Sequence, residues 1–329
     1  MAKNATSISP IFLPELNGST NFLFRLVFIL GGVFMVHNIH HISGFTKSAK
    51  ESIYFYTEIL GLRLVKNTVN QENTKMRHLF FGDYQGTPGT LLTFFEISKL
   101  GQRRDFNNFF STNYLAIPKG SLQFWKERLL QFNVESHQDD EGLEFTDFDD
   151  FKLKLIETDE QIQPEKATQH STVPAHYQII RIAGTSLVVE NPTLTNQFLH
   201  TYLGIKSTET LQLNNRTSFT IVKKSSEVAK SRIGRGSIDH IAYSAATAAD
   251  LEELYQMALA NQFKIEEYVD RGYFKSLYVK EPNGLRIEIA TELPGFLIDE
   301  DLATLGENLA LPAFLETKRT TITKTLEEL

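Results

Sequence analysis

The sequence contains no cysteine among its 329 residues. Disulfide bonds, metal sites built on thiolates and a cysteine nucleophile are therefore excluded together. Any metal ion bound by this protein has to be held by histidine, aspartate, glutamate or tyrosine side chains.

Basic residues are also in the minority. Lysine and arginine number 33 against 40 aspartates and glutamates, which gives a net charge of -7 and an isoelectric point near 5.8. Binding to nucleic acid depends on clustered lysine and arginine, and the sequence concentrates them nowhere. We therefore expect a small-molecule ligand and no nucleic-acid partner.

Long hydrophobic runs are scarce. The one markedly apolar segment, residues 21–36, is interrupted by Arg25 and is shorter than the roughly 20 residues that a membrane-spanning helix needs. No small-x-small cleavage site of a signal peptide follows it. We expect no membrane partner and a cytoplasmic protein.

The same segment raises the question of where translation starts. Codons for Gly31 and Gly32 can spell a ribosome-binding sequence just upstream of Met35. We therefore predict that synthesis begins at Met35 and that residues 1–34 are an extension that is not translated natively. Mass spectrometry of the natively expressed protein tests this, and a chain that includes residues before Met35 would contradict it.

The sequence repeats itself, which indicates a fold built from similar units. Residues 55–62 and 198–205 share the pattern F-x4-L-G-[LI], in which a helix is expected to end at glycine and a strand to follow. A second match pairs His41 with His240, each seven residues before a hydroxyl side chain suited to cap a helix. The units therefore begin alike and turn alike.

Hydrophobic periodicity places helices and strands within each unit. A helix is expected from about Ser48, a second over 122–130, and a third whose apolar stripe includes Leu254 and Leu259. Polar stretches at 159–172 and 223–236 have the composition of linkers. The result is an α+β fold of four tandem βαβββ modules with a C-terminal tail that carries a helix from about Pro312. The expected bounds are 35–100 for module 1, 110–160 for module 2, 174–223 for module 3, 236–292 for module 4 and 293–329 for the tail.

Two strands of module 4 carry the chemistry. Successive side chains of a strand point to opposite faces, so His240 is expected on one face and Asp239 on the other. The same rule places Glu288 on a face with Arg286, opposite a core of Leu285, Ile287 and Ile289. A charged side chain between apolar neighbours needs a partner, and a metal ion or an ion pair would supply one.

Module 1 offers a histidine but no matching carboxylate. Aligning residues 88–93 with 283–288 places Thr93 at the position of Glu288. If modules 1 and 4 pair edge to edge, His41, His240 and Glu288 converge, while modules 2 and 3 form a half without a metal. Two imidazoles and one carboxylate are the face that non-haem Fe(II) oxygenases present to their metal.

The remaining histidines have simpler interpretations. His78 is expected to line a pocket at most. The others are most simply surface or structural residues: His37, His137, His170, His176 and His200. The acidic run from Asp139 to Asp150 lacks the ligand order of a calcium loop and is expected to be a solvated surface.

Taken together, the motifs resemble the vicinal oxygen chelate (glyoxalase-like) superfamily and, within it, the hydroquinone-type and other ring-cleaving extradiol dioxygenases of bacteria. The resemblance extends from Met35 to the end of the chain. It is carried by five segments: residues 40–42, 86–95, 239–242, 270–291 and 311–316.

The resemblance implies two glyoxalase-like half-barrels, with modules 1 and 4 sharing a metal site. It implies that His41, His240 and Glu288 bind Fe(II), with Mn(II) as a second candidate. Arg271 and Tyr278 would line the substrate side. His40 and Ser43 match pocket positions more loosely. The sequence departs from the hydroquinone enzymes at Asp239, where a second histidine is often found, and this leaves the exact substrate open.

The function implied is insertion of O2 into a hydroquinone or catechol with opening of the ring. A glyoxalase-type lyase or isomerase is the first alternative, although Thr93 stands where its additional carboxylate ligand is expected. A metal-free protein that binds aromatic or quinone-like compounds is the second. Assembly into a homo-oligomer is left open.

Overall fold

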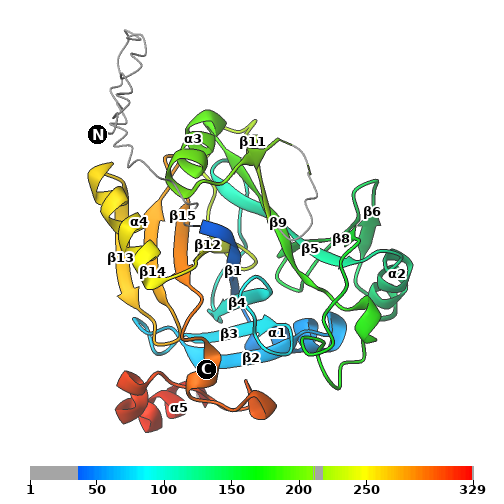
Figure 1. Cartoon of the computed structure of the whole chain (residues 1–329). Coiled ribbons are helices and arrows are strands. Elements are labelled where there is room, and N and C mark those ends of the chain that lie inside the picture. The colour runs from blue at the N-terminus through cyan, green and yellow to red at the C-terminus, as the bar shows by residue number, and fades with distance from the viewer. Residues whose placement is uncertain (1–35, 210, 212–217, 328–329) are drawn as a thin grey trace, which may run out of the picture.

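The computed structural model describes residues 36–209, 211 and 218–327 (Figure 1). The extension predicted at 1–34 lies outside the described residues. Two mixed β-sheets form the body of the molecule, and helices cover their outer faces. None of the helices in the described part of the chain has the length and apolar character that a bilayer crossing requires.

The first sheet combines the two ends of the chain. Its eight strands run in the order β13-β14-β15-β12-β1-β4-β3-β2. Module 1 contributes β1 (Val36–Thr46), β2 (Arg63–Val69), β3 (Arg77–Gly82) and β4 (Leu91–Glu96). Module 4 contributes β12 (Ile238–Ala245), β13 (Lys264–Asp270), β14 (Lys275–Lys280) and β15 (Arg286–Thr291). The predicted edge-to-edge pairing of modules 1 and 4 is confirmed, through antiparallel β1 and β12.

Modules 2 and 3 build the second sheet in the same way. Its seven strands run in the order β10-β11-β9-β5-β8-β7-β6, and the two modules meet where β5 pairs with β9. The bounds are β5 (Phe109–Pro118), β6 (Ser136–Gln138), β7 (Leu143–Thr146), β8 (Lys152–Thr158), β9 (Arg181–Val189), β10 (Ser207–Thr208) and β11 (Phe219–Lys224). The two half-barrels are therefore formed by different pairs of modules, and in both the modules meet through their first strands.

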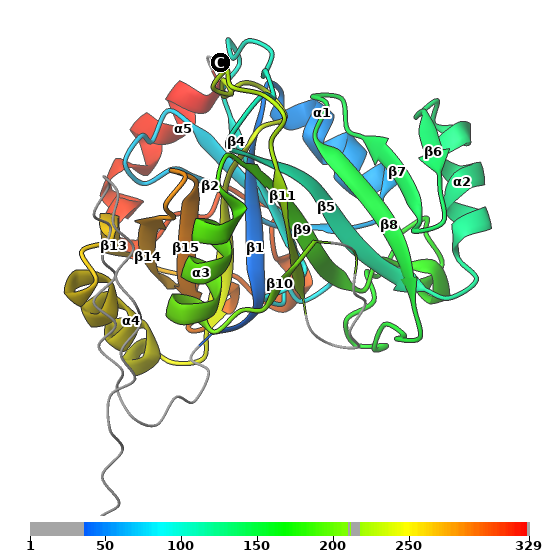
Figure 2. The same cartoon turned by 90° about the horizontal axis from the view of Figure 1, so that it is seen from above.

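One helix in each module covers the outer face of its strands. Figure 2 shows α4 and α2 at opposite ends of the molecule with β1 between them. The helices are α1 (Ala49–Ile53), α2 (Leu122–Gln131), α3 (Pro192–Leu203) and α4 (Ala248–Ala260). The expected caps are present, since Ser48 Oγ accepts a hydrogen bond from the Glu51 amide and Thr247 forms a capping box with Asp250. Helix α1 continues as a π-helix over Tyr54–Ile59, a local widening that the sequence pattern did not predict.

Helix α4 corrects one detail of the predicted apolar stripe. Leu251, Leu254 and Ala258 are buried against the sheet, whereas the Leu259 side chain is 47% exposed. Tyr255 is half-buried and stacks on Tyr268 of β13. The helix contacts the sheet along a narrow line, so a residue at the margin of the stripe remains in solvent.

The C-terminal tail packs against the edge of the first sheet. It consists of short 3-10 turns at Phe296–Ile298, Leu302–Thr304 and Ala313–Lys318, followed by α5 (Arg319–Glu327). Leu311, Leu315, Ile322 and Leu326 form an apolar cluster with Val69 of β2. The Ala310 amide donates to the Asn67 carbonyl at 2.8 Å, so the tail covers the free edge of β2.

Candidate metal centre

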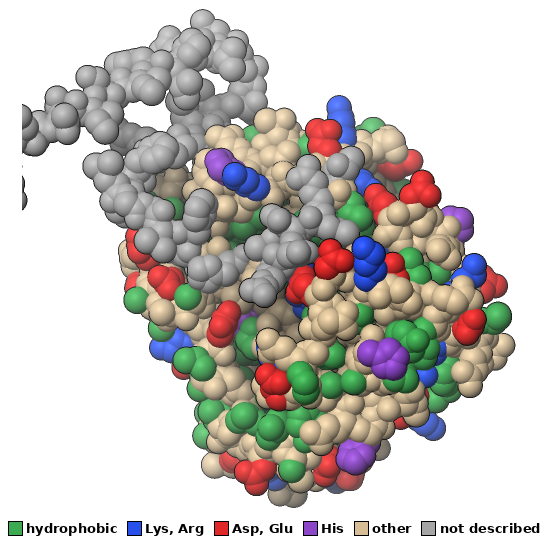
Figure 3. Space-filling view, turned by 45° about the vertical axis from the view of Figure 1, so that its right-hand side comes forward, with side chains coloured by type: hydrophobic (Ala, Val, Ile, Leu, Met, Phe, Trp, Pro, Cys, Tyr) green, Lys and Arg blue, Asp and Glu red, His purple; other side chains and the backbone are tan. Residues whose placement is uncertain are grey.

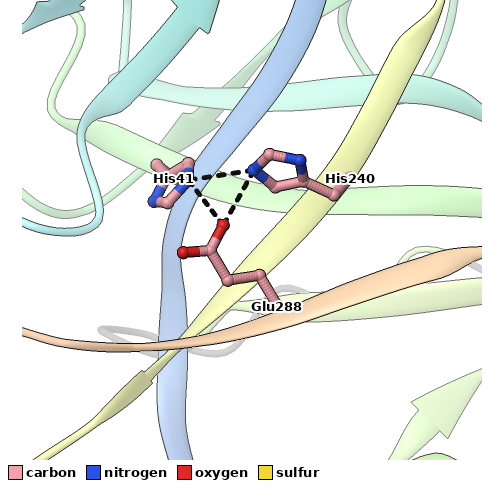
Figure 4. A group of neighbouring side chains, drawn as sticks. All are labelled: His41, His240 and Glu288. Carbon is pink, nitrogen blue, oxygen red and sulfur yellow. Dashed lines mark hydrogen bonds and ion pairs between the residues drawn. The ribbon is translucent and has the colours of Figure 1, made fainter. Parts of the chain in front are cut away.

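Three neighbouring strands position the predicted ligands. Strand β12 pairs with β1 on one side and with β15 on the other, and in that register Ala242 lies beside both His41 and Glu288. His240 lies two residues along β12 on the same face. As Figure 4 shows, His41 of β1, His240 of β12 and Glu288 of β15 point toward one another.

The three donor atoms form a compact triangle. His41 Nε2 lies 3.2 Å from His240 Nε2 and 3.2 Å from Glu288 Oε2, and His240 Nε2 lies 2.8 Å from Glu288 Oε2. Ligands at right angles around a metal with bonds of about 2.1 Å are about 3.0 Å apart. The edges of the triangle therefore match one face of an octahedral coordination sphere.

The electrostatics of the triangle suit a cation. All three side chains are buried, and Glu288 Oε2 has no hydrogen bond of acceptable geometry although both imidazoles are close. Burial alone would raise the pKa of Glu288, but His41 and His240 hold it well below the usual range, so the carboxylate is charged. Burial lowers the pKa of His41, which favours the neutral imidazole that binds metals.

The second polar atom of each ligand is held by a neighbour. His240 Nδ1 lies 2.7 Å from Asp239 Oδ2, and Ser276 Oγ donates to Glu288 Oε1 at 2.6 Å. His41 Nδ1 lies 2.9 Å from His40 Nδ1. Such outer contacts fix ring orientation and tautomer in metal sites. The residues present therefore fit a metal ion in both their donor atoms and their supporting contacts.

The contact between Asp239 and His240 corrects the expectation that these side chains face apart. Alternation fixes the direction of Cβ only, and the register of β1 and β12 shifts opposite this point, between Ser43 and Gly44. A second shift lies between Ile39 and His41. Irregular pairing of this kind redirects side chains next to functional sites.

A cavity of about 170 Å³ lies beside the triangle. His41 and His240 form part of its wall together with Tyr278, Arg271 and His78. The pocket position predicted for His78 is confirmed. About half of the remaining wall is apolar or aromatic: Phe45, Val69, Met76, Phe80, Phe95, Tyr273 and Phe274. The other half is polar: Thr68, Asn70, Gln71, Glu72, Asp239 and Arg286. An apolar cavity of about 150 Å³ can hold benzene, so this one has room for a single ring.

Tyr278 and Arg271 lie together on the wall of the cavity. The Tyr278 ring centroid is 5.4 Å from that of His240 and 5.2 Å from the Arg271 guanidinium carbon. The guanidinium carbon of Arg286, which the sequence did not single out for the pocket, lies 4.2 Å from the centroid of the same ring. The available signal was strand alternation, which places Arg286 on the same face of β15 as Glu288, two residues further on. In the same way it places Ser276 on the same face of β14 as Tyr278.

His40 occupies a different place. It is buried behind His41, where its ring packs 5.3 Å from that of Phe274, and it is not among the residues that line the cavity. Its Nε2 atom has no hydrogen-bond partner among the described residues. The structure therefore places His40 against a predicted ligand, and its catalytic role remains a prediction.

The position of Thr93 relates module 1 to module 4. Thr93 pairs with Ser43 as Glu288 pairs with Ala242, which confirms that the two positions are equivalent. Its hydroxyl lies 2.6 Å from Ser43 Oγ and 3.0 Å from His78 Nε2. A small hydrogen-bonded cluster thus stands where a fourth ligand carboxylate would be.

The predicted surface histidines are exposed, as expected: His137, His170, His176 and His200. The side chain of His37 lies outside what the structure describes. Figure 3 shows one face on which lysine and arginine side chains are scattered among acidic ones.

Comparison with known proteins agrees with the fold. The family model of the Glyoxalase/Bleomycin resistance protein/Dioxygenase superfamily matches residues 38–99. A relative from Bacillus subtilis (strain 168), MhqE, is 35% identical over 301 residues, which cover 88% of this chain and 98% of that one. The chain belongs to this superfamily. Glyoxalase I from Zea mays shares the fold at 12% identity, with a TM-score of 0.56 over 78% of this chain and 92% of that one.

Within the superfamily, the full-length relatives carry names of one kind. The name of MhqE assigns it provisionally to the ring-cleaving dioxygenases. A crystal structure of a provisionally assigned dioxygenase from Bacillus subtilis aligns with a TM-score of 0.81 and 29% identity over 89% of this chain and 97% of that one. Chlorohydroquinone/hydroquinone 1,2-dioxygenase from Sphingobium indicum is 25% identical over 320 residues, which cover 89% of this chain and 97% of that one.

Proposed function

We propose that this protein is an Fe(II)-dependent, extradiol-type dioxygenase that opens the ring of a hydroquinone or catechol. The observation that carries the proposal is the convergence of His41, His240 and Glu288 on one point beside a cavity of about 170 Å³. The names of the full-length relatives support the same reaction class.

The three ligand residues would hold the metal and leave the opposite side of its coordination sphere open. Bound Fe(II) would supply a binding site for a phenolic oxygen and for O2 and would allow electrons to pass from the ring to oxygen. The chain's contribution is to position the ring. The aromatic wall, which includes Phe80, Phe95 and Phe274, would hold it in place and exclude water.

Tyr278 and Arg271 are proposed to act on the substrate oxygen. Burial raises the pKa of Tyr278, so its phenol keeps its proton and can donate a hydrogen bond to an oxygen that becomes negative. The Arg271 guanidinium beside it would stabilise the same negative charge. His40 is proposed to act through His41, because its ring nitrogen contacts that residue.

The lyase alternative is disfavoured by one observation. The position equivalent to Glu288 in module 1 is Thr93, whose hydroxyl is engaged by Ser43 and His78. It cannot supply the additional carboxylate that a glyoxalase-type site uses.

Iron content and oxygen consumption of the same preparation test the proposal. The protein is purified anaerobically, its metal is measured, and O2 uptake is followed with hydroquinones and catechols. We expect bound iron and O2 uptake in proportion to the ring compound consumed, with a ring-opened acid as product. A preparation that binds these compounds without metal would instead support the binding protein, and turnover without O2 uptake would support the lyase.

A further inference from the structure

The charged groups around the cavity form an unusual arrangement. Among the residues that line it in the described part of the chain, the lysine and arginine side chains are Arg271 and Arg286 alone. A cation in a substrate pocket commonly binds an anionic group of the substrate. The question is whether either arginine is available to do so.

Arg271 is already paired with two carboxylates. Its Nη2 atom lies 2.7 Å from Glu267 Oε2 and 3.0 Å from Glu72 Oε1. Contact with Glu267 and with Arg271 lowers the pKa of Glu72, so Glu72 is the more readily ionised member of this pair. Burial and contact with Glu72 raise the pKa of Glu267. Glu72 and Glu267 therefore compensate the positive charge of Arg271, which can still donate a hydrogen bond to a substrate oxygen but leaves no net positive charge for a fully anionic substituent.

Arg286 is paired in the same way. Its Nη1 atom lies 3.2 Å from Asp239 Oδ2, and its Nε atom lies 3.1 Å from Glu266 Oε2. Asp239 is in turn bound to His240. Both guanidiniums are thus paired with carboxylates, and two of these, Glu72 and Asp239, line the cavity themselves.

An anionic substituent in this cavity would find no lysine or arginine that is not already paired. It would lose part of its hydration close to the carboxylates of Glu72 and Asp239, and the other polar wall residues Thr68, Asn70 and Gln71 carry no charge to offset this. An uncharged ring would meet no such cost. Selection against a competitor through an unpaired buried charge is an effective source of specificity.

We infer that the site is selective for uncharged single-ring diphenols and rejects rings that bear a carboxylate, and that Glu72 and Glu267 impose this selection through Arg271. The inference rests on the proposed function, since it names the substrate class of the same site. Glu72 and Glu267 are specificity-determining residues that act through Arg271.

Matched ligand pairs test the inference by binding. The dissociation constants of 4-methylcatechol and 3,4-dihydroxybenzoate, and of 2-methylhydroquinone and 2,5-dihydroxybenzoate, are measured on the iron-loaded protein by anaerobic calorimetry. In each pair an uncharged methyl group, the smaller substituent, takes the ring position of the carboxylate. We expect the methyl compound to bind at least ten-fold more tightly. Equal affinities within both pairs would overturn the inference.

Two variants assign the effect to its residues. Glu72 is 59% exposed, so the Glu72→Gln variant is expected to fold normally. It should reduce the ratio of the two dissociation constants within each pair several-fold. The double variant Glu72→Gln/Glu267→Gln should reduce this ratio about ten-fold. Glu253→Gln, on the exposed side of α4, is the matched control and should leave the ratio unchanged. An unchanged ratio in the double variant would overturn the role of these carboxylates.

The same samples separate this inference from the proposed function. O2 uptake is recorded with each compound after air is admitted. Selective binding without O2 uptake would contradict ring cleavage but support the selection by charge. O2 uptake with both members of each pair at equal affinity would support ring cleavage and overturn the selection.

Discussion

At the scale of single residues, replacement of any one of the three predicted metal ligands should remove the metal. His41→Ala, His240→Ala and Glu288→Ala each delete one corner of the triangle, and we expect each purified variant to retain less than about a tenth of the iron of the parent. Metal analysis by mass spectrometry provides the measurement. His200→Ala, an exposed histidine on α3, should retain the full content. Normal iron in any of the three variants would exclude that residue from the site.

Asp239 is expected to set the orientation of His240. Asp239→Asn removes the charge that holds His240 Nδ1 at 2.7 Å, and we expect metal affinity to fall about 10- to 100-fold with the fold intact. Competition with a chelator of known affinity measures the change. Asp140→Asn, on an exposed loop, is the control. An affinity equal to that of the parent would show that the contact does not support the ligand.

The convergence of His41, His240 and Glu288 could be predicted from the sequence because strand periodicity fixes which residues share a face. Their role as metal ligands remains a prediction. Glu288 between buried Ile287 and Ile289 is the clearest example. Contacts made by the ends of long side chains could not be predicted in this way. Asp239 meets His240 next to a register shift, and Arg286 reaches the Tyr278 ring from a neighbouring strand. Both depend on how the strands are placed in three dimensions.

At the scale of elements, the tail depends on one glycine. Gly306 has a φ of 82°, and a Cβ atom there would lie 1.9 Å from the Leu64 carbonyl oxygen of β2. We expect Gly306→Ala to force the tail away from the strand edge and to lower the free energy of unfolding by more than about 2 kcal/mol.

A second glycine provides the control for this change. Gly284 has a φ of 92°, but a Cβ atom at this position, in the turn before β15, would have no neighbouring atom within 4 Å. Gly284→Ala should therefore lower the free energy of unfolding only by the backbone strain, about 1 kcal/mol. Urea unfolding curves of both variants make the comparison. Equal losses of unfolding free energy in the two variants would mean that the close approach of the tail to β2 does not make Gly306 necessary.

Elements were predicted well where periodicity was strong and poorly where packing decides. Strands of modules 1 and 4 and the capped start of α4 follow from alternation and from the Thr247 hydroxyl. The π-helical turn after α1 and the exposure of Leu259 on α4 could not be predicted from the sequence, because each depends on the residues against which its helix packs. The cytoplasmic location and the oligomeric state remain predictions.

At the scale of the whole molecule, the two half-barrels are joined by buried polar contacts. Tyr56 of module 1 donates its hydroxyl to Asp147 Oδ2 of module 2 at 2.9 Å, and the Thr46 hydroxyl donates to Asp149 Oδ2 at 2.7 Å. Asp147 also accepts hydrogen bonds from the amides of Asp149 and Phe151. Despite these contacts, burial raises the pKa of Asp147 to about 6.

This raised pKa predicts a dependence of stability on pH. Between about pH 4 and pH 6 the folded protein holds a proton that the unfolded chain releases, so this contribution to stability is complete at low pH and is lost as pH rises through 6. A shift from 3.8 to about 6 corresponds to about 3 kcal/mol. Relative to Asp147→Asn, the parent should therefore lose stability by up to that amount between pH 4 and pH 8. Denaturant unfolding across this range measures the difference, and a constant difference would contradict the prediction.

The joining of β1 to β12 has a consequence for how the protein is made. His41 and its partner His240 are separated by 199 positions, and Glu288 is synthesised later still. A growing chain on the ribosome cannot assemble the centre until nearly all of it has emerged. Fragments from interrupted synthesis would lack the complete set of predicted ligands, so a bound metal ion would be confined to chains that include Glu288.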